Sequence, residues 1–220
     1  MMTRASRPAR GGGRWVDVSA ERVERFLAGF AERHGQPDVD PAPDVVRVTA
    51  ADGALAECEV PFPPLDVDTG AAYGGLGVHA RRDRQVGVLL VRRGGFAAGI
   101  FDGVRLVTSK TGSRHVQGRS AAGGWSQQRF ARRREGQARV AVEAAADTVA
   151  AVLLPQWDAL EAVVAGGDRA ACDEVLRDTR LAPLLPLLVG RRLDVPDPRL
   201  RVLEATPAAF RAVRVRLTEP

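Results

Sequence analysis

The sequence predicts a mixed β-sheet with helices packed on it, a fold of the α+β or α/β class. Two observations favour this class. The segment VGVLLV (Val86–Val91) is apolar on both faces, which is typical of a central strand. Beyond Gln127, alanine and valine recur at three- and four-residue spacing, which is typical of a helix with one apolar side. At 220 residues and 45% apolar content, the chain can form either one domain of generous size or a core with a small appendage.

The N-terminal part of the chain is predicted in two pieces. Residues 1–14 are rich in arginine and glycine and are expected to form a disordered basic tail. Residues 15–82 are expected to form a helix, a hairpin and a connector. Ser19 is placed to cap the helix, whose apolar positions recur over Val23–Phe30, and Gly35 ends it.

A β-hairpin is predicted over Val45–Val60. Two strand-like segments flank Asp52-Gly53, which favours a tight two-residue turn. The following residues, 61–82, are broken by proline and glycine and are predicted to be a loop-like connector.

Residues 83–220 are predicted to form the main core. The strand Val86–Val91 is followed by FAAGIF and, after Asp102-Gly103, by VRLVTS. A turn at Thr111-Gly112 is expected to lead into a further strand segment around His115. These segments together predict consecutive antiparallel strands.

Helices and strands are predicted to alternate in the rest of the core. The helix after Gln127 is expected to end at Pro155 and to bury one stripe against the sheet (Ala131, Ala138, Val142, Ala145, Val149 and Val152). ALEAVVAG is then predicted to be a buried strand, with Asp168 as the cap of the next helix. Alternating Arg and Val/Leu over Arg211–Thr218 predicts an edge strand with one wet face.

Positive charge is concentrated in one segment. From Val104 to Arg139 there are nine positive residues and one negative residue, whereas the formal net charge of the whole chain is +5. Such local concentration indicates a phosphate-binding surface rather than general solubility.

The segment RSAAGGWSQQRFARRREGQ (Arg119–Gln137) combines adjacent glycines, a glutamine pair and an arginine cluster. From these residues alone, the simpler interpretation is a loop whose Ser126 caps the next helix, with the arginines on a solvated face of that helix. Together with the preceding hairpin, however, the segment resembles the core of the Vms-type release factors, the VLRF branch of the archaeo-eukaryotic peptide release factors. It is most similar to the actinobacterial branch.

The resemblance is strongest over Gly94–Arg134 and rests on a G-x-x-Q motif, here Gly124-Trp125-Ser126-Gln127. It implies an RNase H-like fold, as in the catalytic middle domain of those factors, over residues 83–220. It also implies peptidyl-tRNA hydrolase activity on stalled ribosomes, with peptidyl-tRNA and the large ribosomal subunit as partners and no cofactor. The substrate could be met on an intact ribosome, on a split large subunit or free.

The resemblance also assigns roles to individual residues. Gln127 is expected to position water, and Gly124 to give the backbone the freedom for a close approach. Gln128 is the rival for the catalytic role. The residues expected to contact substrate or RNA are Gly123, Trp125, Ser126, Gln128, Arg119, Arg129, Arg132, Arg133, Arg134 and Lys110.

Other observations narrow the functional classes. Two distant cysteines and three scattered histidines predict neither a zinc site nor any other metal cluster, and they fit a reduced, cytoplasmic protein. No apolar run approaches the roughly 18–20 residues of a membrane span, and no secretory segment is recognisable. A non-catalytic RNA- or ribosome-binding module is the first alternative. A metal-dependent nuclease is the second, disfavoured because Val86–Val91 and Phe96–Phe101 lack acidic residues.

Overall fold

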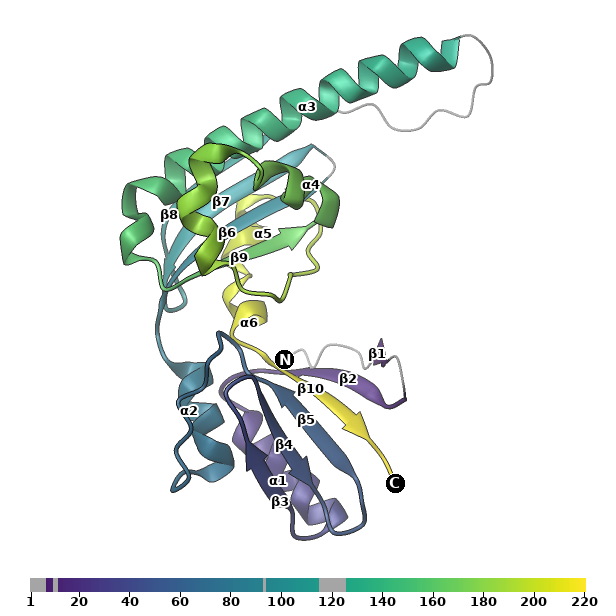
Figure 1. Cartoon of the computed structure of the whole chain (residues 1–220), viewed down its shortest axis with the longest axis vertical. Coiled ribbons are helices and arrows are strands. Elements are labelled where there is room, and N and C mark those ends of the chain that lie inside the picture. The colour runs from purple at the N-terminus through teal and green to yellow at the C-terminus, as the bar shows by residue number, and fades with distance from the viewer. Residues whose placement is uncertain (1–6, 10–11, 93, 115–125) are drawn as a thin grey trace. The chain divides into compact units, whose positions relative to one another are not determined.

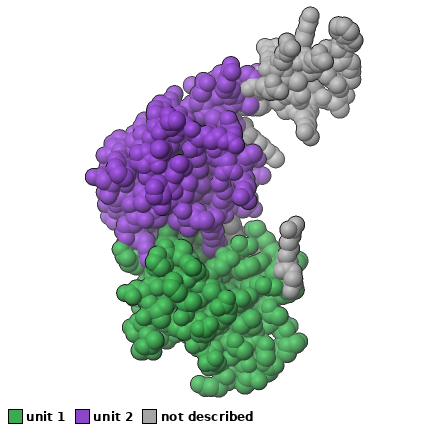
Figure 2. Space-filling view, viewed as in Figure 1, with its two compact units in different colours: residues 1–82, 207–220 green, residues 83–206 purple. Residues whose placement is uncertain are grey.

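The structure is a computed structural model that describes residues 7–9, 12–92, 94–114 and 126–220, without the side chains of 126–135. The chain folds into two compact units (Figure 2). The first unit comprises the chain up to Arg82 together with Pro207–Pro220, and the second comprises Asp83–Thr206. The chain therefore leaves the first unit, forms the second and returns. The last segment, expected from the sequence to belong with the core, contributes to the first unit instead.

The first unit contains an antiparallel sheet in the order β1-β2-β10-β5-β4-β3 (Figure 1). Its strands are β1 (Arg7–Pro8), β2 (Arg14–Val18), β3 (Asp38–Pro41), β4 (Val45–Thr49), β5 (Leu55–Glu59) and β10 (Val213–Thr218). Its helices are α1 (Val23–His34), α2 (Leu76–Arg81), which follows a 3₁₀ turn at Ala72–Gly75, and α6 (Pro207–Phe210). Alternate strand residues such as Val46, Val48 and Val215 are buried in one core with Leu27 and Phe30 of α1.

The predicted helix α1 is present, but its first residue is not capped as expected. It begins at Val23, and its N-cap position is occupied by Arg22, without a side-chain capping bond. Ser19 instead contributes its backbone carbonyl, which accepts from the amide of Arg22 at 2.9 Å. The helix starts one turn beyond Ser19, where the chain first turns its apolar residues toward the sheet.

The predicted hairpin is confirmed with a longer turn. Ala50 donates its amide to the carbonyl of Ala54 at 2.8 Å, so three residues rather than two lie between this hydrogen-bonded pair. The Asp52 carboxylate accepts from the amide of Ala54 at 2.9 Å, and Gly53 has a φ of 92°. A side-chain bond and a left-handed glycine are the features of the three-residue loop, which the Asp-Gly pair alone does not distinguish from the two-residue turn.

Three other parts of the first unit differ from the structure predicted for them. Arg7–Pro8, within the predicted disordered tail, pairs with Arg14 and Trp15 of β2. The predicted connector contains α2. Strand β10 alternates as predicted, but it lies between β2 and β5 rather than at an edge. Its half-buried side chains lie on one face of the sheet, whereas hydrogen bonds to neighbouring strands occupy both of its edges. Alternation reveals the first property but not the second.

The second unit contains a mixed sheet in the order β8-β7-β6-β9. Its strands are β6 (Gln85–Arg92), β7 (Gly95–Asp102), β8 (Arg105–Ser113) and β9 (Ala162–Gly167). Its helices are α3 (Ser126–Leu153), α4 (Arg169–Val175) and α5 (Leu200–Glu204), with 3₁₀ segments at Leu154–Ala159 and Thr179–Leu187. Strands β6, β7 and β8 are antiparallel neighbours, and α3 then leads back to β9, which runs parallel to β6. The expected mixed sheet with packed helices is confirmed, and this order agrees with an RNase H-like arrangement.

The two faces of this sheet are covered differently. On one face, Leu89, Ala98 and Ile100 are buried together with Ala145 and Val149 of α3. On the other face, Leu203 of α5 packs so closely over β7 that a Cβ on Gly99 would lie 2.9 Å from the leucine Cδ2. Both faces are thus occupied, as expected for strands that are apolar throughout.

Helix α3 packs on the sheet with its C-terminal half. Ala145, Val149 and Val152 of the predicted stripe are buried, but Ala138 is exposed. In Figure 1 the N-terminal half of α3 projects beyond the strands. The helix ends at Leu153, two residues before Pro155.

Strand β9 and the cap of α4, where Asp168 accepts from the amide of Ala171, are both as predicted. Within the described residues, no helix has the length and apolarity that crossing a membrane requires.

Candidate functional site

The candidate catalytic residues belong to residues 114–128, which connect the end of β8 with the first turn of α3. We call these residues the glycine–glutamine segment. Residues 115–125 lie outside the described part of the chain, so the structure does not test the expectations for His115, Arg119, Gly123, Gly124 and Trp125. The helix begins at Ser126, and the backbone of Gln127 and Gln128 therefore lies in the first turn of α3 rather than in a loop. The side chains of Arg129, Arg132, Arg133 and Arg134 also lie outside the described residues.

The start of α3 offers backbone donors to a ligand. The first four amides of an α-helix have no acceptor within the helix, and aligned peptide dipoles place partial positive charge there. In α3 this set includes the amides of residues 126–128. The proposed catalytic glutamine, whichever of Gln127 and Gln128 it is, has its own backbone N–H in this set.

The strand β8 fixes where this segment begins. It continues through Thr111 and Gly112 to Ser113, so the predicted turn at Thr111-Gly112 is wrong. Gly112 lies opposite Phe96, and a Cβ on it would meet the phenylalanine ring at 2.5 Å. A glycine at this position lets the strand continue over the ring, whereas the sequence alone suggested a chain reversal.

Lys110 is the one predicted contact residue whose side chain falls in the described part of the chain. It is exposed on β8 and pairs with Ala98 of β7. Directly paired residues point to the same face of a sheet, and Ala98 is buried against α3. Lys110 therefore lies on the face that carries α3, the helix that begins with the glutamine pair.

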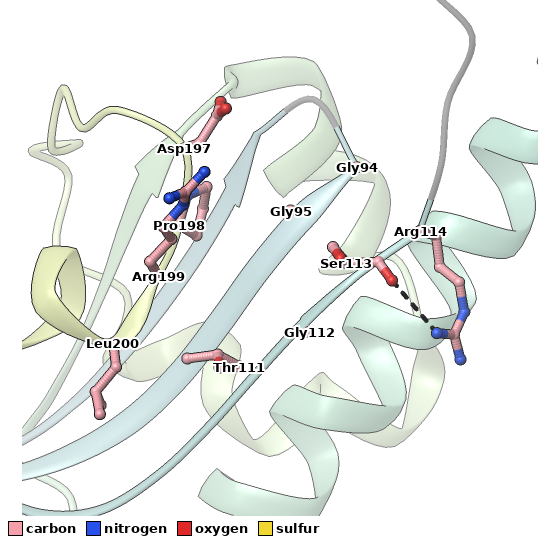
Figure 3. A pocket seen from close by; sticks show the side chains of 10 residues that line it. All are labelled: Gly94, Gly95, Thr111, Gly112, Ser113, Arg114, Asp197, Pro198, Arg199 and Leu200. Carbon is pink, nitrogen blue, oxygen red and sulfur yellow. Dashed lines mark hydrogen bonds between the residues drawn. The ribbon is translucent and has the colours of Figure 1, made fainter.

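A polar hollow of about 500 Å³ lies beside the end of β8 (Figure 3). Its lining comes from the β6–β7 turn, the end of β8 and the segment before α5: Gly94, Gly95, Thr111, Gly112, Ser113, Arg114, Asp197, Pro198, Arg199 and Leu200. Arg199 and Asp197 are both exposed, and neither makes an ion pair with another described residue. Figure 3 shows the Arg114 side chain directed away from Asp197–Leu200, on the α3 side of the strand.

Sequence reasoning missed the wall of this hollow formed by Asp197–Leu200. The segment is far from β8 in the sequence and carries no recognisable motif. Pro198 within this segment and Pro196 just before it predict a loop but not the strand that the loop packs against.

The two cysteines do not have the properties of nucleophiles. Burial raises the pKa of Cys58 to about 12. Burial also raises the pKa of Cys172, whose thiol donates to the carbonyl of Gly166 at 3.3 Å. Buried thiols of this kind are inert. Among the described residues, no three or more His, Cys, Asp or Glu side chains are grouped as metal ligands.

Comparison with solved structures finds archaeal proteins. The crystal structure of an archaeal translation termination factor, aRF1, is 17% identical with a TM-score of 0.40, covering 74% of this chain and 51% of that one. A second archaeal protein matches over the same shares with 17% identity and a TM-score of 0.41. Pelota of Archaeoglobus fulgidus is 10% identical with a TM-score of 0.27, covering 96% of this chain and 68% of that one. The chain spans about half the length of the first two proteins.

No curated protein matches the chain. In contrast, the sequence profile of the Actinobacteria/chloroflexi VLRF1 release factors matches residues 84–216. The match covers well over half of the sequence and includes the whole of the second unit's sheet, the glycine–glutamine segment and α3. The chain therefore belongs to the Actinobacteria/chloroflexi VLRF1 release factor family.

Proposed function

We propose that this protein is a peptidyl-tRNA hydrolase that frees nascent peptides from tRNA on stalled ribosomes in the cytoplasm. One observation carries the proposal: in a chain of a release-factor family, the G-x-x-Q motif of the sequence ends at Gln127, whose backbone lies in the first turn of α3. Peptidyl-tRNA would be the substrate, and the large ribosomal subunit and its RNA would be the partners.

The reaction needs little from the protein beyond placement. Water attacks the ester carbonyl carbon, the bond to the terminal ribose oxygen breaks, and the products are a peptide carboxylic acid and a free ribose hydroxyl. Such an ester is already activated, so orienting the water and supporting negative charge on oxygen supply most of the catalysis. The Gln127 amide can accept from the water and donate to the developing oxyanion without any change of its own charge.

Three features support this assignment. The first amides of α3, which have no acceptor within the helix, would donate to the same oxyanion. Lys110, on the α3 face of β8, and the arginines of α3 would bind tRNA or ribosomal RNA phosphates. The polar hollow beside Arg114 would leave room for the end of the tRNA next to the segment.

The test is release from ribosome-bound peptidyl-tRNA by purified protein, with the freed peptide and the intact tRNA measured separately. Gln127→Ala is expected to reduce release by about 10²–10³-fold, the usual effect of removing one oxyanion donor. Gln128→Ala is the matched control, because it makes the same change one residue away. Ribosome co-sedimentation should be equal for both variants.

Two other outcomes have distinct meanings. If only Gln128→Ala is inactive, the catalytic glutamine is one residue further along. If the wild-type protein binds ribosomes but frees no peptide, the hydrolase proposal fails. The basic segment then belongs to a non-catalytic RNA-binding module.

A further inference from the structure

The first unit contains a groove of about 240 Å³ along one side of α1. It is lined by the end of β2 and by one stripe of the helix: Asp17, Val18, Ser19, Arg22, Arg25, Phe26, Gly29 and Arg33. These residues lie outside the region matched by the release-factor profile. The proposed ester hydrolysis therefore gives them no role.

The helical members of the groove share one side of α1. At 100° per residue, the positions 22, 25, 26, 29 and 33 fall within an arc of about 100°. The buried residues Val23, Leu27 and Phe30 lie next to this arc and face the core. Between Arg22 and Arg33 the helix rises by about 16 Å, long enough to follow several units of an extended polymer.

The arginines of this groove differ from others in the same unit. Arg22, Arg25 and Arg33 are exposed, and none makes an ion pair within the described residues. By contrast, the arginines of the neighbouring sheet lie near carboxylates: Arg14 with Glu219, Arg47 with Glu57, Arg214 with Glu59 and Arg216 with Glu57. The sheet neutralises its positive charges internally, whereas the groove leaves three positive charges against the single carboxylate of Asp17 in its lining.

We propose that this groove binds the phosphate backbone of single-stranded RNA. Three guanidinium groups in a row match the repeated charges of such a strand, and each can donate two parallel hydrogen bonds to one phosphate. The half-buried ring of Phe26 offers an apolar surface on which a base can stack. Gly29 adds no side chain to the groove. The space where its Cβ would lie is empty, and the nearest atom there is at the end of the Arg33 side chain, 3.6 Å away.

An acidic protein segment is the competing occupant, and the groove fits it less well. Aspartate and glutamate side chains would need a matching spacing along a partner helix or strand. A nucleic acid carries a charge on every nucleotide and needs no such sequence. The aromatic ring within the stripe also suits a base rather than a carboxylate.

The first experiment measures binding of a fluorescein-labelled single-stranded RNA oligonucleotide to the full chain across a salt series. The variant Arg22→Gln/Arg25→Gln/Arg33→Gln should reduce the log–log salt slope by about 2 units, since each phosphate contact on a single strand contributes roughly 0.7. The control Arg14→Gln/Arg47→Gln/Arg214→Gln removes the same charge from the sheet of the same unit and should leave the slope unchanged. Melting midpoints check that both variants fold.

The second experiment adds charge instead of removing it. Gly29→Glu places a carboxylate in the groove, and Ala28→Glu places the same charge one residue away, about 100° around the helix. Ala28 is exposed and does not line the groove. RNA affinity should fall for Gly29→Glu alone.

The outcomes distinguish RNA binding in the groove from a general effect of the protein's positive charge. Equal losses for the groove variants and their controls, or no loss in either, would overturn the proposal. Binding of a labelled poly-glutamate peptide that depends on the groove, together with unchanged RNA binding, would assign the groove to an acidic protein instead. The measurement contains no release step, so it succeeds or fails independently of Gln127.

Discussion

The backbone N–H of Arg114 donates a hydrogen bond of 2.8 Å to the carbonyl oxygen of Gly94. Beside it, Ser113 pairs with Gly95 in the last described pair of β8 and β7. The sheet and its β6–β7 turn therefore fix the point at which the glycine–glutamine segment leaves β8. Changes in packing at this end of β8 should therefore lower the rate of peptide release.

Gly112→Ala is expected to destabilise the second unit. The new methyl group would lie 2.5 Å from the Phe96 ring, which is only 5% exposed and cannot swing into solvent. Overpacking of this kind costs about 1–3 kcal/mol. Urea unfolding midpoints measure the loss, and release from stalled ribosomes should fall with it.

Gly136→Ala is the matched control for this change. Gly136 lies within α3, and a Cβ there would meet nothing within 4 Å. Replacing an interior helical glycine with alanine stabilises a helix by about 0.5–1 kcal/mol. A Gly112→Ala variant as stable as the wild-type protein would show that the Phe96 ring can move aside.

The arginines after the glutamine pair are expected to set the salt dependence of RNA binding. Replacing Arg129, Arg132 and Arg133 with glutamine should reduce the log–log salt slope for tRNA or ribosomes by up to about three units. Thermal stability should hold or rise slightly, because glutamine retains helix propensity and like-charge repulsion is relieved. Binding titrations across a salt series and thermal melts measure the two effects.

A control for this variant changes three exposed arginines elsewhere in the second unit, Arg169, Arg177 and Arg201. If both sets reduce the slope equally, the effect belongs to net charge. An unchanged slope in the α3 variant would remove these arginines from the RNA-binding surface.

Local signals predicted much of the fold. Val86–Val91 is a central strand because it is apolar on both faces, and Asp168 caps α4 because its carboxylate can accept from an amide three residues on. Alternation in β10 showed that one face is buried. The identity of its partners was not encoded locally, since β2 and β5 lie far away in the sequence.

The same distinction applies to the candidate site. The glutamines are recognisable as a contiguous motif, whereas the hollow beside β8 depends on contact between that strand and Asp197–Leu200. The open groove on α1 likewise requires Asp17 and Ser19 of a neighbouring segment. Sequence patterns reveal residues that act within one segment and miss surfaces assembled from several.

The hairpin turn at Asp52 should make the first unit sensitive to acid. The amide of Ala54, and then the His34 side chain at 2.9 Å, hold the pKa of Asp52 below its usual 3.8. A lowered carboxyl pKa contributes stability above the unfolded value, and that stability is lost as the pH falls through the folded value. Asp52→Ala should therefore reduce the melting midpoint most at neutral pH, and the difference from wild type should shrink well below pH 3.8.

Asp66→Ala is the control for this pH dependence, because Asp66 is an exposed acid of the same unit. Its effect on the melting midpoint should be small across the pH range. A difference for Asp52→Ala that grows toward acid would contradict the assigned hydrogen bonds.

The two buried thiols should report the opening of each unit separately. Cys58 belongs to the core of the first unit and Cys172 to that of the second. Because burial raises both pKa values, neither thiol should react with Ellman's reagent in the folded protein near neutral pH. Cys172→Ser leaves Cys58 as a probe of the first unit, and Cys58→Ser leaves Cys172 as a probe of the second. Rapid reaction of either variant under native conditions would show that its unit opens readily.

The return of the chain to the first unit has a consequence for the order in which the protein is made. Strand β10 joins β2 on one side to β5 on the other. It leaves the ribosome after every strand of the second unit, whose residues end at Thr206. Until then, β2 and β5 each present an unpaired edge that invites association with other chains. During synthesis the second unit can therefore fold first. The sheet of the first unit is completed only when β10 joins β1-β2 to β5-β4-β3.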